Sequence, residues 1–569
     1  MENSNLVQKL EMDLQSARGN HSSQIAIING WRDESNGESY TEASRGGEYG
    51  AVVNKLIKKT IETATPSLVE PFLGNHIVGA QGRDAESDHK AEVASSVLNY
   101  FWNYGINPEE FIEPLVRNLQ TDGTVICKVG WSEDHPTVEE IPLDSLLLDP
   151  SAKRFSDCNF AIEQSKVSVS DILGHSGWYG EHTIESLAPL TAASSEEYDV
   201  NKDGYDSSFN FEDRLRQLVS INTYYGKMEI DGELKSIVAI WSDNFLINMM
   251  DSPYPKSWKG LPFIMTDYIP VSGSIYGKSI ASLLSIDQRI ATSLDRSIMK
   301  QLDHSTIGQR GISQGALDPA NERKFKAGKD FKFNNKTMDI WEGSFTQLSP
   351  DVYALQDKTR VDAEELSGIS RLSAGLDPRA LNSNVSATAS SLVNSNAQRR
   401  LLLVMRHVSS LLEQMFRKWL DITVLMADDL SVRLNNEIMS IQGFDLEGNF
   451  DINIDISTDG QRSEKAQQLS MVLQQLGSNP AIPKSVTMTL TSEFVTALGM
   501  YELGDTLKGL SKQMQQSEGQ PNPMQEAQVK MEMEARQAQI TKDNAQAKKY
   551  EADAVESYVD TELKSYGMA

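Results

Sequence analysis

Two amphipathic helices that flank a lysine-rich segment form the most regular pattern in the chain. Over residues 276–303, apolar side chains recur every three or four positions, which predicts an α-helix with one apolar stripe. The stripe consists of Leu283, Ile286, Ile290, Leu294, Ile298 and Leu302. A second helix, residues 350–370, is predicted to begin after the N-cap Ser349, with a proline at its first position, and to carry Val352 and Leu355 as apolar residues.

The segment between these helices, residues 304–349, has a different pattern. Pro319, several glycines and the alternation Phe331-Lys332-Phe333 indicate turns and short strands rather than a third helix. A helix that leaves the body, a small head and a helix that returns would form a projecting spike. Because a pair of single-stripe helices cannot bury both stripes well, we expect neighbouring copies to cover them in a ring.

The first half of the chain predicts a mixed α+β body. Residues 1–45 are polar and rich in Ser, Gly and Glu, which indicates an extended arm. Amphipathic helices are predicted at 52–72, 84–104 and 108–120, and strands at 124–131, 137–150 and 216–249. Asp231-Gly232 marks a hairpin turn in the last of these, and the acidic residues 176–213 indicate a surface insertion.

The second half is mainly helical, so we assign the chain to an α+β class in which helices dominate. Residues 371–386 contain too many Gly, Pro and Asn residues for a helix, whereas residues 387–428 give the strongest helix pattern in the protein. Its wide stripe comprises Leu401, Val404, Val408, Leu411, Met415, Trp419 and Leu420. A strand pair is predicted at 431–459 and two or three short helices at 460–512.

The tail, residues 513–569, begins as a Gln/Pro/Gly linker and continues as a helix whose apolar positions are mostly alanine. So weak a stripe does not pack alone. Either neighbouring copies form a helical barrel from it, or it is a solvated helix.

Composition narrows the class of protein. A chain of 569 residues is too long for one core and predicts two to four subdomains. Its net charge of −27 argues against a general polyanion-binding surface, and two cysteines indicate a reducing compartment. The N-terminus is polar and acidic, unlike a signal peptide, and no apolar run is long enough to span a bilayer. We therefore expect a product, or a particle component, made in a cytosol.

Two short motifs suggest enzyme chemistry but fit poorly. Gly273 to Ser279 resembles a phosphate loop, yet its spacing is one residue short, and a glycine-flexed helix start explains it better. Gly311, Ser313 and Gly315 match G-x-S-x-G, but the polar approach and nearby proline do not fit a nucleophile elbow. A cytosolic hydrolase or nucleotide-using enzyme built on these near matches is the competing hypothesis.

Metal-site patterns are equally weak. Asp199, Asn201 and Asp203 reproduce half of a calcium loop, but position twelve is Asn210, so any cation site there would be incomplete. A similar run after Asp455 is better explained as a strand end. The eight histidines and two cysteines have no metal-ligand spacing, and no acid/base pair or triad assembles. We predict neither an enzyme nor a cofactor.

The remaining signal is a local excess of positive charge. Residues 304–338 carry Arg310, Arg323, Lys324, Lys326, Lys329, Lys332 and Lys336 against three acidic residues. In a strongly acidic chain, this predicts a docking head for an acidic partner or for nucleic-acid phosphates, with an ordinary solvated loop as the alternative. In 371–386, Arg371 and Arg379 would suit a mobile element that touches a polyanion without gripping it.

In their order, these segments resemble the portal (head-to-tail connector) proteins of tailed double-stranded DNA bacteriophages, most closely those of short-tailed, podovirus-type phages. The resemblance covers roughly residues 50–460 and lies in the order of the motifs. They are Asp84-Ala85-Glu86, Lys128-Val129-Gly130-Trp131, Asp149-Pro150-Ser151-Ala152, Leu261-Pro262-Phe263, Gly277-Lys278-Ser279 and Asp287-Gln288.

The resemblance implies a portal fold assembled as a ring, usually of twelve copies, at one capsid vertex. It divides the chain into an arm (1–45), a wing (46–275 and 387–459), a stem (276–303 and 350–370), a clip (304–349), a tunnel loop (371–386), a crown (460–512) and a linker with a barrel helix (513–569). It assigns docking to the basic clip residues, DNA contact to Arg371, Arg379 and Asn382, and intersubunit packing to the stem stripes.

The same resemblance implies the partners and the location. The partners would be double-stranded DNA, the terminase large subunit, head–tail adaptors, and capsid and scaffolding proteins, with no membrane, metal, cofactor or catalytic residue. The protein would be assembled in the bacterial cytoplasm and become part of the virion, where it admits DNA during packaging and releases it during ejection.

Overall fold

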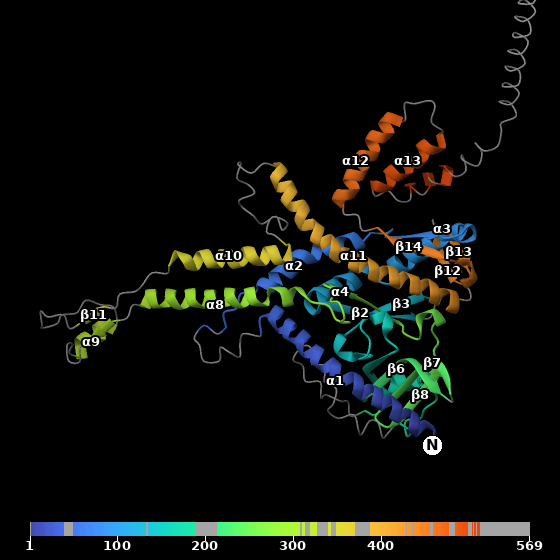
Figure 1. Cartoon of the computed structure of the whole chain (residues 1–569), viewed down its shortest axis with the longest axis horizontal. Coiled ribbons are helices and arrows are strands. Elements are labelled where there is room, and N and C mark those ends of the chain that lie inside the picture. Colours follow the sequence, from blue (N-terminus) through green and yellow to red (C-terminus); the bar gives the residue numbers. More distant parts are fainter. Residues whose placement is uncertain are drawn as a thin grey trace, which may run out of the picture. The chain divides into compact units, whose positions relative to one another are not determined.

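The computed structural model describes most of the chain. The described residues are 2–38, 49, 51–74, 76–132, 135–187, 213–230, 232–307, 310–312, 319–326, 340–342, 349–369, 387–427, 430–434, 437–455, 459–476, 484–498, 503–504, 506–507 and 509–511. The chain divides into two compact units, Met1–Ile456 and Ser457–Ala569. Both α-helices and antiparallel sheets are present and helices dominate, so the predicted class is confirmed (Figure 1).

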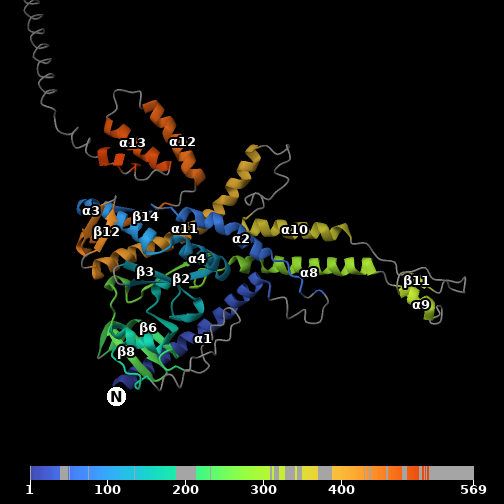
Figure 2. The ribbon, with the colours of Figure 1, turned by 180° about the vertical axis from the view of Figure 1, so that it is seen from behind.

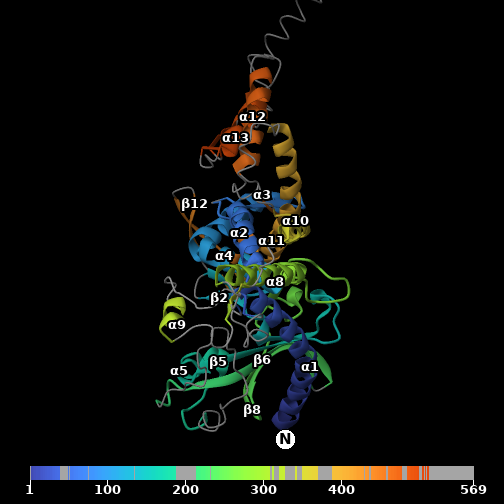
Figure 3. The ribbon, with the colours of Figure 1, turned by 90° about the vertical axis from the view of Figure 1, so that its left-hand side faces the viewer.

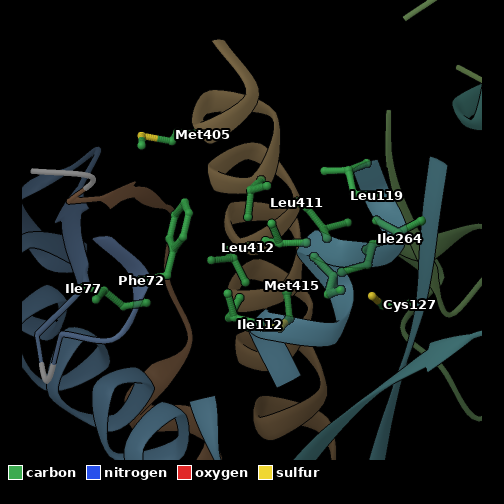
Figure 4. Close-up of a cluster of buried hydrophobic side chains, with 14 of the residues drawn as sticks. Phe72, Ile77, Ile112, Leu119, Cys127, Ile264, Met405, Leu411, Leu412 and Met415 are labelled. Carbon is green, nitrogen blue, oxygen red and sulfur yellow. The ribbon is translucent and has the colours of Figure 1, made fainter. Parts of the chain in front are cut away.

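The long helix α11 (Ala387–Met426) is the centre of the first unit. The strong helix predicted at 387–428 is confirmed, and its stripe from Leu401 to Leu420 is buried. Around it lie α2 (Leu56–Val69), α3 (Ala85–Tyr100) and α4 (Pro108–Asp122), with short turns of 3₁₀ helix at Glu70–Phe72 and π-helix at Phe101–Gly105. Figure 4 shows Leu411 and Met415 of α11 facing Ile112 and Leu119 of α4.

A three-stranded sheet lies beside this helical layer. Its order is β3-β2-β9, formed by β2 (Thr124–Ser132), β3 (His135–Ile141) and β9 (Phe263–Asp267), all antiparallel. The single strand predicted over 137–150 is wrong. Pro142 begins a 3₁₀ turn, Leu143–Ser145, and the chain then enters a different sheet as β4 (Leu146–Leu148).

That second sheet has five antiparallel strands in the order β4-β5-β6-β7-β8. The others are β5 (Phe160–Ser168), β6 (Leu218–Ile230), β7 (Glu233–Ser242) and β8 (Phe245–Asp251), with short helices α5 (Val169–Gly174) and α6 (Ser176–Tyr179), and a 3₁₀ turn at Phe155–Asp157. The predicted β6–β7 hairpin is confirmed, and Gly232 supplies the positive φ of 81° at its turn.

The extended arm predicted at the N-terminus is wrong, because most of it is helix α1 (Glu2–Asn36). Val7, Leu10 and Leu14 are buried against Tyr224 and Trp241 of the five-stranded sheet. The Trp241 indole Nε1 donates a hydrogen bond of 2.7 Å to Glu11. Figure 3 shows α1 running from the vicinity of α8 past β6 and β8. Packing on the sheet therefore compensates for a stripe diluted by Ser, Asn and Gly.

Helices α8 (Ile280–Ile307) and α10 (Pro350–Ser367) lie side by side and extend away from the sheets and α11 (Figures 1 and 2). Between them the described residues form β10 (Arg310–Ile312), paired antiparallel with β11 (Ile340–Glu342), and helix α9 (Pro319–Lys326). The short strands expected here are present. The expectation that no third helix forms is wrong, because Pro319 occupies the first position of α9, where its missing N–H costs nothing.

The end of the first unit differs in part from the predicted strand pair. β12 (Leu430–Leu434) and β13 (Glu437–Ile441) form that pair, but after a 3₁₀ turn, Gly443–Leu446, the strand β14 (Phe450–Ile454) pairs with β1 (Val78–Gly82). Another 3₁₀ turn, Lys256–Trp258, precedes β9. Asp455 continues the β14 ladder through its N–H to Ile77, so the calcium-like run there is a strand end, as expected.

The second unit contains two of the short helices predicted at 460–512, α12 (Asp459–Leu476) and α13 (Lys484–Ala497). Serine and threonine side chains hold α13 to the helical residues 503–504, 506–507 and 509–511, as in the 2.6 Å bond from Ser492 Oγ to the Gly504 carbonyl. Residues 371–386, 188–212 and 513–569 lie outside the described residues. Among the described helices, none has the length and apolar content needed to cross a bilayer.

Candidate functional site: the paired helices α8 and α10

The seam between α8 and α10 is made of small and polar side chains. Ala291 of α8 and Thr359 and Ala363 of α10 are buried. The Gln356 amide adds a hydrogen bond of 2.9 Å to Asp295 across the two helices. Such side chains allow a close approach but bury little apolar surface, and several large apolar residues of both helices lie outside the seam.

Those large apolar residues face outward in the single chain. Ile286 is 68%, Leu302 58% and Leu355 46% exposed, and Ile290 is 38% exposed. The other predicted packing residues, Leu283, Leu294, Ile298 and Val352, are half-buried. The chain therefore covers each stripe only in part, and the role of these residues in packing between copies stays a prediction.

The ends of α10 follow the expected capping pattern. Ser349 Oγ accepts from the Asp351 N–H at 3.3 Å, and Pro350 occupies the first helical position. Gly368 ends the helix with a φ of 72°, and its N–H donates to the Glu364 carbonyl at 2.9 Å. Each end is thus fixed by local sequence.

A short segment before α2, residues 49 and 51–55, runs along α8 and is called the strap below. Its contacts recur along the helix. Tyr49 donates to Asp303 at 2.6 Å, Arg296 Nε donates to the Val52 carbonyl at 2.9 Å, and the Asn54 amide donates to Asp295 at 2.9 Å. The Asn54 N–H also donates to Thr292 at 3.2 Å. No pattern in the sequence identified this segment.

Gln288 joins the start of α2 to the end of α1. Its side chain is fully buried, with Oε1 accepting from the Ile57 N–H at 2.9 Å and Nε2 donating to the Glu34 carbonyl at 2.6 Å. Glu34 also pairs with Arg289. Two residues earlier, Arg32 forms two bonds of 2.7 and 2.9 Å to Asp122 at the end of α4. Helix α8 is therefore held at its base by α1 and α2, and α1 is bonded in turn to α4.

The chain just before α8 crosses the start of β2 at very close range. The Gly277 N–H donates to Thr124 Oγ1 at 2.8 Å, and Thr124 Oγ1 donates to Asp267 at 2.8 Å. A Cβ on Gly277 would lie 2.7 Å from the Asp267 Cβ and 2.8 Å from the Gly123 carbonyl oxygen. Gly277 is therefore required because the two chain segments pack too closely to leave room for a Cβ.

This geometry removes the phosphate-loop alternative. The amides of Gly277 and Lys278 already donate to Thr124 and to the Ile269 carbonyl, so they are not available to cradle a phosphate. The Lys278 side chain is exposed. The glycine-flexed helix start is the interpretation that fits.

The basic residues expected between the helices are only partly described. Arg323 and Lys324 are exposed on α9, Lys326 lies at its end, and Arg310 lies in β10. Lys329, Lys332 and Lys336 lie outside the described residues, as do Arg371, Arg379 and Asn382. Their assigned roles stay predictions.

The structure adds no support for the other candidate motifs. Asp199, Asn201 and Asp203 lie outside the described residues, as do Ser313 and Gly315, while Gly311 lies in β10. Where side chains are described, no group of three or more His, Cys, Asp and Glu residues is placed to hold a metal ion. Cys127 and Cys158 are both free and buried.

Comparison with known proteins gives one family match. Residues 6–146 and 132–540 match the family model described as the phage SU10 portal protein. Among solved structures, similar chains occur in the neck of an empty GTA particle computed with C6 symmetry and in the neck of a native GTA particle computed with C12 symmetry.

The first has 12% identity and a TM-score of 0.39, covering 78% of this chain and 90% of that chain. The second has 12% identity and a TM-score of 0.36, covering 81% and 93%. A chain from the virion of a native gene transfer agent has 11% identity and a TM-score of 0.37, covering 80% and 98%.

Gly277→Ala tests the close crossing before α8. Because the added methyl meets both Asp267 and the Gly123 carbonyl, we expect a loss of about 1–3 kcal/mol in stability. The exposed Lys278→Ala is the matched control and should stay within about 0.5 kcal/mol of wild type. Thermal unfolding midpoints and soluble yield measure both. Loss of nucleotide binding in a well-folded Lys278→Ala protein would contradict this account.

Asp267→Asn tests the buried carboxylate at the same crossing. Burial raises the pKa of Asp267 from 3.8 to about 6, against the lowering effect of the hydrogen bonds from Thr124 and Gly277. The folded state then binds the proton more tightly, so this group's stabilisation is complete below about pH 4 and is lost as the pH rises through about 6.

The variant should therefore be more stable than wild type at pH 8, by about 1–3 kcal/mol, and equal to it near pH 4. Thermal unfolding midpoints at the two pH values measure the difference, with the exposed Asp251→Asn as control. An equal effect of Asp267→Asn at both pH values would contradict the assigned cause.

Proposed function

The chain belongs to the phage SU10 portal protein family, and from this premise we propose that it assembles into the ring-shaped DNA channel at one vertex of a phage capsid. A portal protein is a structural component of the virion and not an enzyme. The observation that best supports the ring is the outward exposure of the apolar residues on α8 and α10.

The physical argument concerns what must cover these residues. Ile286, Leu302 and Leu355 are each more than 45% exposed, while the seam between their helices is small and polar. Exposed apolar surface on a helix pair that extends into solvent marks a contact with another protein surface. A second copy of the same pair supplies such a surface, and repetition of one head-to-tail contact closes into a ring.

The parts of this ring follow from the family organisation. We assign α8 and α10 to the stem (276–303 and 350–370), residues 304–349 to the clip and 371–386 to the tunnel loop. The wing comprises 46–275 and 387–459, the crown 460–512, and residues 513–569 a linker and barrel helix, with 1–45 as the N-terminal arm. Twelve copies are expected.

The partners follow from the proposed place in the particle. Double-stranded DNA passes through the ring, and the net charge of −27 per copy disfavours adhesion of a polyanion to its wall. The basic clip is the proposed docking point for the terminase large subunit and later for head–tail adaptors. Capsid and scaffolding proteins surround the ring during assembly.

Replacing Ile286 and Ile290 together by Asp tests the stem contact. Both side chains are exposed in the single chain, so each subunit should fold normally, while charges in an apolar interface should prevent ring formation. Mass photometry and negative-stain imaging measure the assembly. Leu234→Asp, at a residue 70% exposed in the β6–β7 hairpin, is the control and should form rings. Intact rings in the double variant would refute the stem contact.

Neutralising the clip tests the docking assignment. In Arg323→Gln with Lys324→Gln, two exposed charges on α9 are lost while helix propensity is retained. We expect normal rings with weakened binding to the terminase large subunit, and the difference from wild type should shrink at higher salt, which screens the same charges. A matched change of the exposed Lys153 and Lys227 should have no effect on a pull-down. Unchanged binding after the α9 substitutions would argue against docking at the clip.

A further inference from the structure

The two sides of the α8–α10 pair are chemically different. Asp295 of α8 accepts hydrogen bonds from both Asn54 of the strap and Gln356 of α10, at 2.9 Å each. The strap therefore lies on the side of the pair that Asp295 and Gln356 mark. This side is called the strap flank.

The opposite side carries the apolar residues. Asp287 of α8 and Asp362 of α10 interact electrostatically across that side. Because an α-helix repeats every 3.6 residues, Asp287 shares its side of α8 with Leu283, Ile290 and Leu294. By the same spacing, Asp362 shares its side of α10 with Leu355 and Leu366. This side is called the apolar flank.

The flanks also differ in charge. On the apolar flank, the two carboxylates lie close enough that the pKa of Asp287 is raised by burial and by the charge of Asp362. The strap flank carries three basic residues: Lys55 is exposed on the strap, Arg296 bonds the Val52 carbonyl, and Arg360 pairs with Asp357 at 3.2 Å. Asp295 and Asp303 lie on the same flank, where Asn54 and Tyr49 of the strap donate to them. The strap flank thus offers basic side chains that the two carboxylates of the apolar flank can face.

We propose that the apolar flank of one copy docks on the strap flank of the next, so that the strap forms part of the subunit interface. In this contact, Ile290 and Leu355 cover the half-exposed Val52 and Val53 of the neighbour, while Asp287 and Asp362 face its basic residues. The inference rests on the proposed ring and names the surfaces that build it.

The charges also disfavour a contact between two apolar flanks. If two apolar flanks met face to face, the Asp287 and Asp362 carboxylates of both copies would come together in a surface that excludes water. Such an isologous contact would end in dimers. The contact between unlike flanks is heterologous, so it continues from copy to copy and closes as a ring.

Cysteine crosslinking of the full chain tests the pairing. Ile290→Cys places a thiol on the apolar flank and Ala51→Cys places one on the exposed strap, while the native Cys127 and Cys158 are buried. With a flexible bis-maleimide, the double variant should give a ladder of covalent multimers on denaturing gels. Each single variant should give monomers only. Leu234→Cys in place of Ala51→Cys is the control and should give no ladder.

Reversing the charges provides the second test. Asp287→Lys with Asp362→Lys, added to the double-cysteine chain, should abolish the ladder, because like charges then face each other across the contact. Reversal of the exposed Glu185 and Glu229 should leave the ladder intact.

The outcomes separate the two proposals. Crosslinked dimers from Ile290→Cys alone would overturn the pairing in favour of a face-to-face contact. Rings seen by microscopy without a ladder would also overturn the pairing but leave the ring standing. A ladder that survives the charge reversal would overturn the role assigned to Asp287 and Asp362 in the contact. Wild-type protein that forms no ring would overturn the proposed function itself.

Discussion

The structure depends on one constraint: a pair of long helices holds together through small and polar side chains, and several of its large apolar side chains remain in water. Ala291 and Thr359 are buried and Gln356 bonds Asp295 across the pair, while Ile286 and Leu355 are exposed. Within a monomer this is the reverse of the usual arrangement, in which the apolar stripe of a helix faces the core. Exposure of these apolar side chains to water is unfavourable, and this unfavourable exposure ends when an identical subunit covers them.

The rest of the first unit fixes the position of that helix pair. Gly277 brings the chain against the start of β2, the strap bonds α8 at several levels, and Gln288 joins α8 to α1 and α2. Helix α1 spans about 52 Å at 1.5 Å per residue and connects this base to the five-stranded sheet. A subunit that must repeat the same contact around a ring needs a stem whose direction is fixed relative to its body, and these contacts supply it.

The sequence predicted the parts whose signal is local. The stripe of α11, the N-cap at Ser349 and the β6–β7 turn at Gly232 each depend on a few neighbouring residues, and all three occur as predicted. The arm at 1–45 was mispredicted because α1 is a weak helix by pattern that gains its stability from the sheet beneath it. The strap, and the pairing of β14 with β1, depend on contacts between residues hundreds of positions apart, which no short pattern records.

The most direct test is the assembly state of the purified full-length protein. Sedimentation analysis over a wide concentration range, combined with negative-stain imaging, measures both mass and shape. The account predicts a closed ring with a central hole, of about twelve subunits, that persists on dilution. A compact, well-folded monomer at high concentration would contradict it.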